Sequence, residues 1–226
     1  KVVVAKLERV FIPSKLTDNL MLMRNDPAYV LRLRQSGSEQ LVRAWLDGDW
    51  NVIDGAFFSE FDYSKHVLGI SWLKLMPERA TRFRAFDWGS ARPFSVGWYV
   101  VSDGTWGLPK GALVKYREWY GSKAPNVGLK MQASEVAEGI RLREKEDGWN
   151  INYGVSDPAI FIRNGGPSIG ETMLIHGVAW RPADNKRIPG WEQLHQRLLG
   201  SEGVPMLYFL ESCEDTIRTL PLVQHD

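Results

Sequence analysis

The chain has 226 residues, of which 44% are apolar and 24% charged, proportions typical of a soluble globular protein with a sizeable core. Its formal net charge of +1 excludes the overall basic character of many small nucleic-acid binders but leaves room for a local basic cleft. The single Cys213 excludes an internal disulfide, and without a long apolar run or an opening signal peptide we expect neither a membrane span nor secretion.

Residues 1–56 predict a short helical segment that precedes a larger domain over residues 57–226. Asp26 followed by Pro27 indicates a helix start in "NDPAYVLRLRQ", and Ser38 can cap a second helix. The apolar stripe of that second helix comprises Leu41, Val42, Trp45 and Leu46.

The larger domain begins with three strand-like runs, "TRFRAFD", "FSVGWYVVSD" and "ALVKYREWY", separated by turn residues at 89–93 and 103–110. Short links between consecutive strands predict an antiparallel meander. A helix in "SEVAEGIRLREKEDG" follows, with Gly148 at its end. Its apolar face comprises Ala133, Val136, Ala137 and Ile140.

Strands and helices then alternate. We expect strands in "NINYGVSD", "GVAWRP" and "MLYFLES", and helices in "SIGETMLIH", "PGWEQLHQRLL" and "CEDTIRTL". A meander followed by this alternation predicts an α/β fold, a mixed sheet flanked by helices, with the helical segment before it.

Two of the predicted strands end in aspartate. Phe83, Ala85 and Asp87 share one strand face, as do Tyr153, Val155 and Asp157, so each run carries apolar residues inward and then delivers a carboxylate. If the strands are neighbours, the carboxylates converge, and a divalent cation would keep both ionised. Hard oxygen ligands suit Mg²⁺ or Mn²⁺, and paired ions are a standard arrangement for phosphodiester hydrolysis. The alternative is that the aspartates only cap turns, Asp87 through Ser90.

The topology is that of the RNase H-like nuclease fold: the first strand of a meander, and then the strand after the first helix, carry the acids. Nearly the whole chain resembles the C-terminal part, including the nuclease domain, of the large terminase subunit of tailed bacteriophages. The motifs are "GAFFSEFDYSKHV", "FRAFDWGSARPFSVGW" and "GVSDPAIF", preceded by Arg9, Ile12-Pro13, Asp18-Asn19 and Gly48-Asp49-Trp50.

This resemblance implies a metal-dependent endonuclease that cuts double-stranded concatemeric DNA during viral genome packaging by a two-metal mechanism. Asp87 would bridge two Mg²⁺ or Mn²⁺ ions and Asp157 would hold one. The implied partners are an ATPase motor domain of the full-length protein, the portal and the small terminase subunit, with no membrane. The implied location is the cytoplasm of the infected or lysogenic bacterial host.

The resemblance also implies a third acid, on a helix that we expect beyond residue 226. Glu214 and Asp215 fall at a predicted helix start, where capping is the expected role, and Asp226 is also near; none is assigned the third role. Basic residues in loops after strands could contact DNA phosphates or simply be solvated: Arg163, Lys186 and Arg187. Because no Gly-Lys pair exists, a phosphate-binding loop is missing and ATP hydrolysis is not expected.

Two other functions remain open at this point. One is a junction resolvase or transposase-like nuclease, since the fold alone does not choose a substrate. The other is a catalytically inactive docking module of a packaging motor.

Overall fold

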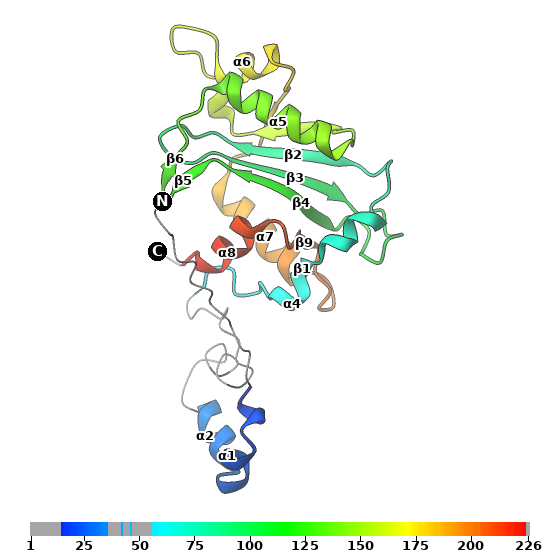
Figure 1. The fold of residues 1–226 in the computed structure, drawn as a ribbon, viewed down its shortest axis with the longest axis vertical. Coiled ribbons are helices and arrows are strands. Elements are labelled where there is room, and N and C mark those ends of the chain that lie inside the picture. The colour runs from blue at the N-terminus through cyan, green and yellow to red at the C-terminus, as the bar shows by residue number, and fades with distance from the viewer. Residues whose placement is uncertain (1–14, 36–41, 43–45, 47–55, 225–226) are drawn as a thin grey trace, which may run out of the picture. The chain divides into compact units, whose positions relative to one another are not determined.

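In the computed structural model the described residues are 15–35, 42, 46 and 56–224 (Figure 1). The chain divides into two compact units. One comprises Lys1–Ser59 with Pro221–Asp226, and the other comprises Glu60–Leu220.

Residues 15–35 of the first unit form η1 (Leu16–Asp18), α1 (Leu20–Asn25) and α2 (Tyr29–Gln35). The side chain of Asn19 caps α1 by accepting a hydrogen bond from the backbone N–H of Leu22 at 3.1 Å. Of the predicted apolar stripe only Val42 and Leu46 are described, both helical. The other residues named above for this segment lie outside the described residues: Arg9, Ile12-Pro13, Ser38, Leu41, Trp45 and Gly48-Asp49-Trp50.

The second unit is built on a seven-stranded mixed sheet in the order β1-β9-β4-β3-β2-β7-β8, with a separate β5–β6 pair. The strands are β1 (Val67–Leu68), β2 (Arg82–Asp87), β3 (Ser95–Val101), β4 (Leu113–Tyr120), β5 (Ser122–Ala124), β6 (Val127–Gly128), β7 (Tyr153–Ser156), β8 (Arg181–Pro182) and β9 (Leu207–Leu210). The helices are α4 (Tyr63–His66), η2 (Ile70–Leu75), α5 (Ala133–Asp147), η3 (Pro158–Phe161), α6 (Ile169–Ile175), α7 (Arg187–Leu199) and α8 (Glu214–Thr219). The last described helix, η4 (Leu220–Leu222), begins at the final residue of this unit.

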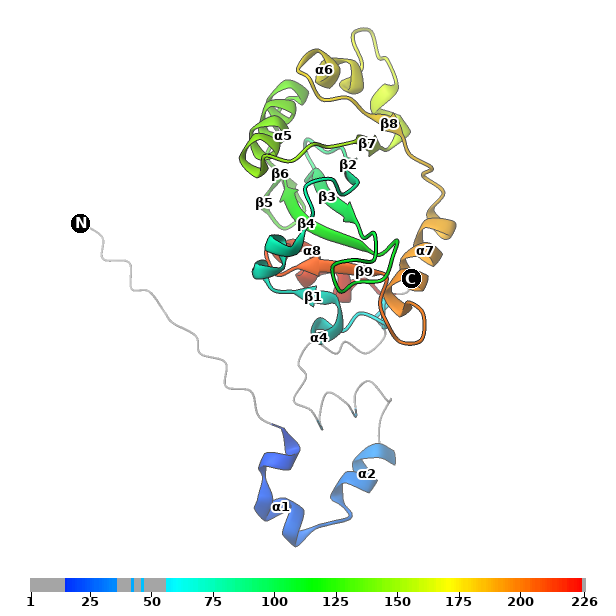
Figure 2. The ribbon, with the colours of Figure 1, turned by 90° about the vertical axis from the view of Figure 1, so that its right-hand side faces the viewer.

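The predicted meander and alternation are confirmed. Strands β2, β3 and β4 are antiparallel neighbours, while β7 joins β2 in parallel and β8 joins β7 in parallel. Strand β9 returns to the far side of β4, again in parallel, and Figure 2 shows β4 between β9 and β3. The carboxyl ends of β2, β4, β7 and β8 therefore share one edge of the sheet.

Helices cover both faces of this sheet: α5 and α6 lie on one side, and α7 and α8 on the other (Figure 1). Helix α5 places Val136, Ala137 and Ile140 in the core, as predicted. It ends at Gly148, whose φ of 69° is the left-handed conformation that glycine adopts without strain.

The prediction of which face points inward is wrong for β2, and also for β7, whose buried residues lie on the face opposite to Tyr153 and Val155. Phe83 and Ala85 are only half-buried, whereas Arg84 and Phe86 on the opposite face are buried. Burial of an arginine is possible here because its guanidinium has partners: the Nη1 of Arg84 donates to the Glu144 carboxylate of α5 at 2.7 Å, and Nη2 donates to the Ala179 carbonyl at 2.9 Å. Asp87, at the end of the strand, therefore belongs to the less buried face of β2.

Helix α8 is hydrogen-bonded to Glu118, a residue of β4 that forms a buried ion pair with Lys115 of the same strand. The Glu118 carboxylate accepts from Lys115 Nζ at 2.8 Å and from the Asp215 backbone N–H at 2.7 Å. Burial alone would raise the pKa of Glu118, but Lys115 and these hydrogen bonds lower it below its usual value. Next to this pair, Cys213 is fully buried, and burial raises the pKa of its thiol to about 12.

Among the described helices, none combines the length and apolar character needed to cross a bilayer.

Candidate metal centre

The two predicted carboxylates follow a matched pair of residues on neighbouring strands. Phe86 of β2 is in register with Ser156 of β7, and the next residue in sequence after each of them is Asp87 or Asp157, respectively. The Ser156 hydroxyl donates to the Phe86 carbonyl at 2.9 Å, which ties the strand ends together. The structure thus brings Asp87 and Asp157 to one end of the sheet, as predicted from their strand positions.

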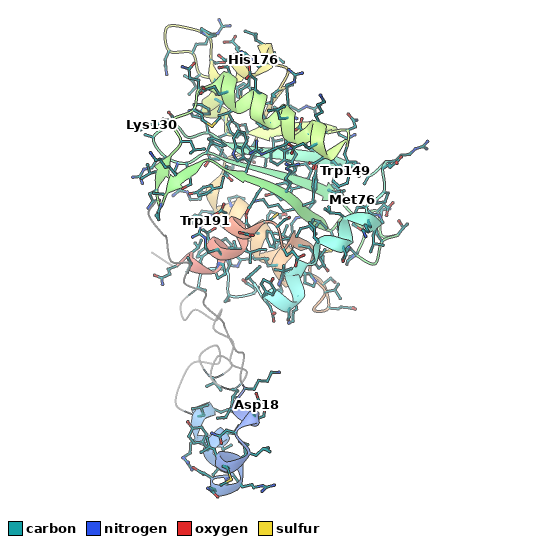
Figure 3. All side chains as sticks on the ribbon, viewed as in Figure 1. Asp18, Met76, Lys130, Trp149, His176 and Trp191 are labelled. Atoms are coloured by element: carbon teal, nitrogen blue, oxygen red, sulfur yellow. The ribbon has the colours of Figure 1, made fainter. Side chains whose placement is uncertain are left out.

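The same edge carries the loop and hairpin that follow β2 and β4. The backbone N–H of Lys130 donates to the Ser90 carbonyl at 3.2 Å, just past Asp87. In Figure 3 Lys130 lies at this edge, and Met76 and Trp149 lie at the opposite edge, near where β2 begins.

The Asp87 carboxylate is exposed and has no hydrogen bond or ion pair to any residue in the described part of the chain, so the proposed turn cap through Ser90 is not seen. Its pKa is raised above the usual value, first by partial desolvation and then by repulsion from Asp157. Asp157 is therefore close enough to disfavour the charge of Asp87, which is the electrostatic condition that a bound cation would relieve.

Asp157 is half-buried and has two hydrogen-bond partners. One oxygen accepts from the backbone N–H of Ala159 at 2.8 Å, which caps η3, and the other accepts from Asn185 Nδ2 at 3.2 Å. The cap that was the alternative interpretation is therefore present at Asp157. It leaves lone pairs on both carboxylate oxygens for another ligand.

The predicted basic residues lie in different surroundings. Lys186 and Arg187 directly follow Asn185; Lys186 lies 3.7 Å from the Asp184 carboxylate, and Arg187 stacks on Trp191 at 5.6 Å from the ring centroid. Arg163 instead makes a bidentate pair with Glu171, and this pair, with further hydrogen bonds from Ser168, lowers the pKa of Glu171 to about 2. The pair occupies Nε and Nη2 of Arg163, so a phosphate would have to compete with the Glu171 carboxylate for this guanidinium.

Two carboxylates with oxygen atoms to spare fit one hard divalent ion, which binds one or two protein carboxylates and completes its shell with water or substrate oxygens. In residues 15–35 and 56–224, no group of three or more His, Cys, Asp or Glu side chains is arranged to hold a metal. Glu214 and Asp215 lie in the first turn of α8, as predicted, but the N-cap is Cys213 and no side chain caps the helix there; Asp226 lies outside the described residues.

Sequence reasoning missed Ser156 and Asn185. A serine inside a strand and an asparagine in the polar stretch "PADNKR" carry no periodic signal. Only the parallel pairing of β7 with β2 and β8 brings them to the carboxylates.

No protein-family model and no curated protein sequence matches this chain. Among solved structures, it is similar to the large terminase of a thermophilic bacteriophage, with a TM-score of 0.57 and 18% identity over 92% of this chain and 45% of that one. It is also similar to the nuclease domain of the P22 large terminase, with a TM-score of 0.56 and 14% identity over 76% of this chain and 81% of that one.

At these identities the similarity concerns the fold. The chain spans about half the length of the thermophilic-phage terminase. It has the fold of a large-terminase nuclease domain, an RNase H-like mixed α/β fold, and the predicted resemblance is confirmed at that level.

Proposed function

We propose that this chain is a divalent-metal-dependent endonuclease that cuts double-stranded DNA during phage genome packaging. The observation that carries the proposal is the pair of carboxylates, Asp87 and Asp157, one residue past a register pair on adjacent parallel strands. The repulsion that Asp157 exerts on the Asp87 carboxylate supports a role of the two residues in holding a cation. The similarity in fold to the nuclease domain of the P22 large terminase supports DNA as the substrate of this proposal.

The chain's own residues supply the carboxylates for the metal ions and the positive charges for the DNA backbone. Asp87, without a protein partner among the described residues, and Asp157, half-buried and held by two hydrogen bonds, are the residues that would hold the ions. Bound Mg²⁺ or Mn²⁺ would supply an activated water and would stabilise the leaving oxygen of the phosphodiester. Lys186 and Arg187, next to Asn185, would contact the DNA backbone, and Arg163 is a weaker candidate for the same task.

In the complete protein, the nuclease would act with an ATPase motor domain, the portal and the small terminase subunit in the host cytoplasm. The thermophilic-phage terminase has been solved in complex with ADP, which supports a nucleotide-binding motor in that protein. The present sequence contains no phosphate-binding loop, so the proposal places ATP hydrolysis elsewhere.

The test is Mn²⁺-dependent nicking of supercoiled plasmid. We expect slow nicking by the wild-type chain and none by Asp87→Ala or Asp157→Ala, with the fold of each variant checked by circular dichroism. Asp103→Ala is the matched control: Asp103 is an exposed aspartate just past the end of β3, at the opposite edge of the sheet.

The same assay separates the alternatives. A strong preference for four-way junctions over linear duplex would favour a junction resolvase. Retained nicking in either aspartate variant would remove that residue from the mechanism. No metal binding at millimolar Mn²⁺ would favour the inactive docking module.

A further inference from the structure

We infer that Asn185 is a positioning residue of the metal site: it fixes the orientation of the Asp157 carboxylate without neutralising its charge. This inference rests on the proposed function, since it concerns how the same carboxylates are prepared for a cation. The observation behind it is the hydrogen bond from Asn185 Nδ2 to the Asp157 carboxylate at 3.2 Å.

The chemistry of the contact assigns its direction. An ionised carboxylate can only accept hydrogen bonds, so the asparagine must present its NH₂ group to Asp157. The other carboxylate oxygen accepts from the Ala159 backbone N–H at 2.8 Å. With one donor on each oxygen, rotation of the carboxylate is restricted, and the remaining lone pairs keep one orientation.

Backbone pairing explains why Asn185 can reach the site. The ladder between β7 and β8 continues past the strand ends, because the backbone N–H of Ala183 donates to the Ser156 carbonyl at 2.8 Å. Ser156 also binds the carbonyl of Phe86 through its hydroxyl. Ser156 therefore joins β2, β7 and β8 at the level of the carboxylates, and Asn185 lies two residues past the last of these bonds.

A neutral donor suits this position better than a cationic one. A lysine or arginine at residue 185 would cancel the charge of Asp157 and compete with the metal ion. The adjacent Lys186 is instead 3.7 Å from Asp184. Asn185 thus holds Asp157 in place without adding a positive charge beside the two carboxylates.

The experiment compares Asn185→Leu, which has a similar size but no donor, with the control Asn164→Leu in the exposed loop before α6. Mn²⁺ binding is measured by electron paramagnetic resonance, and nicking is measured over a range of Mn²⁺ concentrations. Thermal melting without metal checks that both variants are folded.

We expect Asn185→Leu to weaken Mn²⁺ binding about tenfold, the usual loss when a residue that orients a metal ligand is removed. The Mn²⁺ concentration at half-maximal nicking should rise by the same factor, and the rate at saturating Mn²⁺ should return to within about twofold of wild type. Asn164→Leu should match the wild type in every measurement.

Unchanged Mn²⁺ affinity in Asn185→Leu would overturn the inference, and so would a lower maximal rate with unchanged affinity, which would assign Asn185 to the substrate. Asp157→Ala distinguishes a failure of this inference from a failure of the proposed function. If the wild type binds Mn²⁺, Asp157→Ala does not, and Asn185→Leu binds as well as wild type, then only the inference fails. If the wild type binds no Mn²⁺, both the proposed function and the inference fail.

Discussion

Asp87→Asn should make the metal-free protein more stable while abolishing its nuclease activity. Asp87 has no hydrogen bond or ion pair within residues 15–35 and 56–224, so the amide loses no contact there. What the substitution removes is the repulsion between the Asp87 and Asp157 carboxylates, which raises the pKa of Asp87 together with its desolvation.

The size of this effect follows from strand geometry. Neighbouring strands lie about 4.8 Å apart, so side chains one residue past a register pair are roughly 6 to 8 Å apart. In an effective dielectric of about 40 to 80, suited to an exposed site, two unit charges at that distance repel by about 0.5 to 1.4 kcal/mol. For a domain of this size, relief of that repulsion raises the melting temperature by about 1 to 5 °C.

The dependence on pH has a definite sign. The folded-state pKa of Asp87 is raised, so the fold disfavours the ionised form. The repulsive penalty is absent below the pKa of an unfolded aspartate, about 4, and develops as the pH rises through the raised folded-state value. The advantage of Asp87→Asn should therefore be present at pH 7 and vanish below about pH 4.

The assay is thermal unfolding of both proteins with EDTA and with Mn²⁺. Mn²⁺ at ten times its dissociation constant should stabilise the wild type by about 1.4 kcal/mol and leave Asp87→Asn unchanged. A variant that is less stable than wild type in EDTA at pH 7 would refute the reasoning, since Asp87 would then be a structural residue. A stability difference that does not vary with pH would refute it as well.

Three further outcomes are expected. Glu118→Ala should lower the free energy of unfolding in urea by about 3 kcal/mol, because it leaves the buried Lys115 ammonium without its counter-charge. The double variant Lys115→Met with Glu118→Leu should be within about 1 kcal/mol of wild type, and an equal loss of stability in both variants would contradict this explanation. Lys186→Gln and Arg187→Gln should each weaken binding of unrelated DNA duplexes equally and lower the salt slope by about 0.9, measured by fluorescence anisotropy; an unchanged slope removes that residue from the interface. Gly148→Ala should lower stability by about 1 kcal/mol in thermal unfolding, because φ is 69° there; no loss would mean that the end of α5 can rearrange.

Period-two patterns were sufficient to predict that β2 and β7 are strands, although not which face points inward, and their adjacency was implied only by the resemblance to the RNase H-like fold. The position of Asp87 and Asp157 at one end of the sheet could then be predicted, because each ends a strand and parallel strands end on the same side. The role of Gly148 as the end of α5 could be predicted because a glycine after a periodic apolar face commonly ends a helix.

The burial of Arg84 and the contact of Asn185 could not be predicted in this way. Arg84 is buried because Glu144, sixty residues away in sequence, supplies a counter-charge, and no local pattern contains that information. Strand β8 has only two residues, so its register with β7, and hence the reach of Asn185, depends on tertiary pairing. The missed residues are thus those whose role comes from long-range contacts.

The buried Cys213 gives the protein a natural reporter of local opening. It is the only cysteine in the sequence, it lies at the start of α8, and its thiol is almost wholly protonated at neutral pH. A thiol reagent can therefore react only when α8 separates from β4, so the modification rate counts those separations in the native state. Measured with and without Mn²⁺, this rate would show whether events at the carboxylates reach a helix that the metal does not touch.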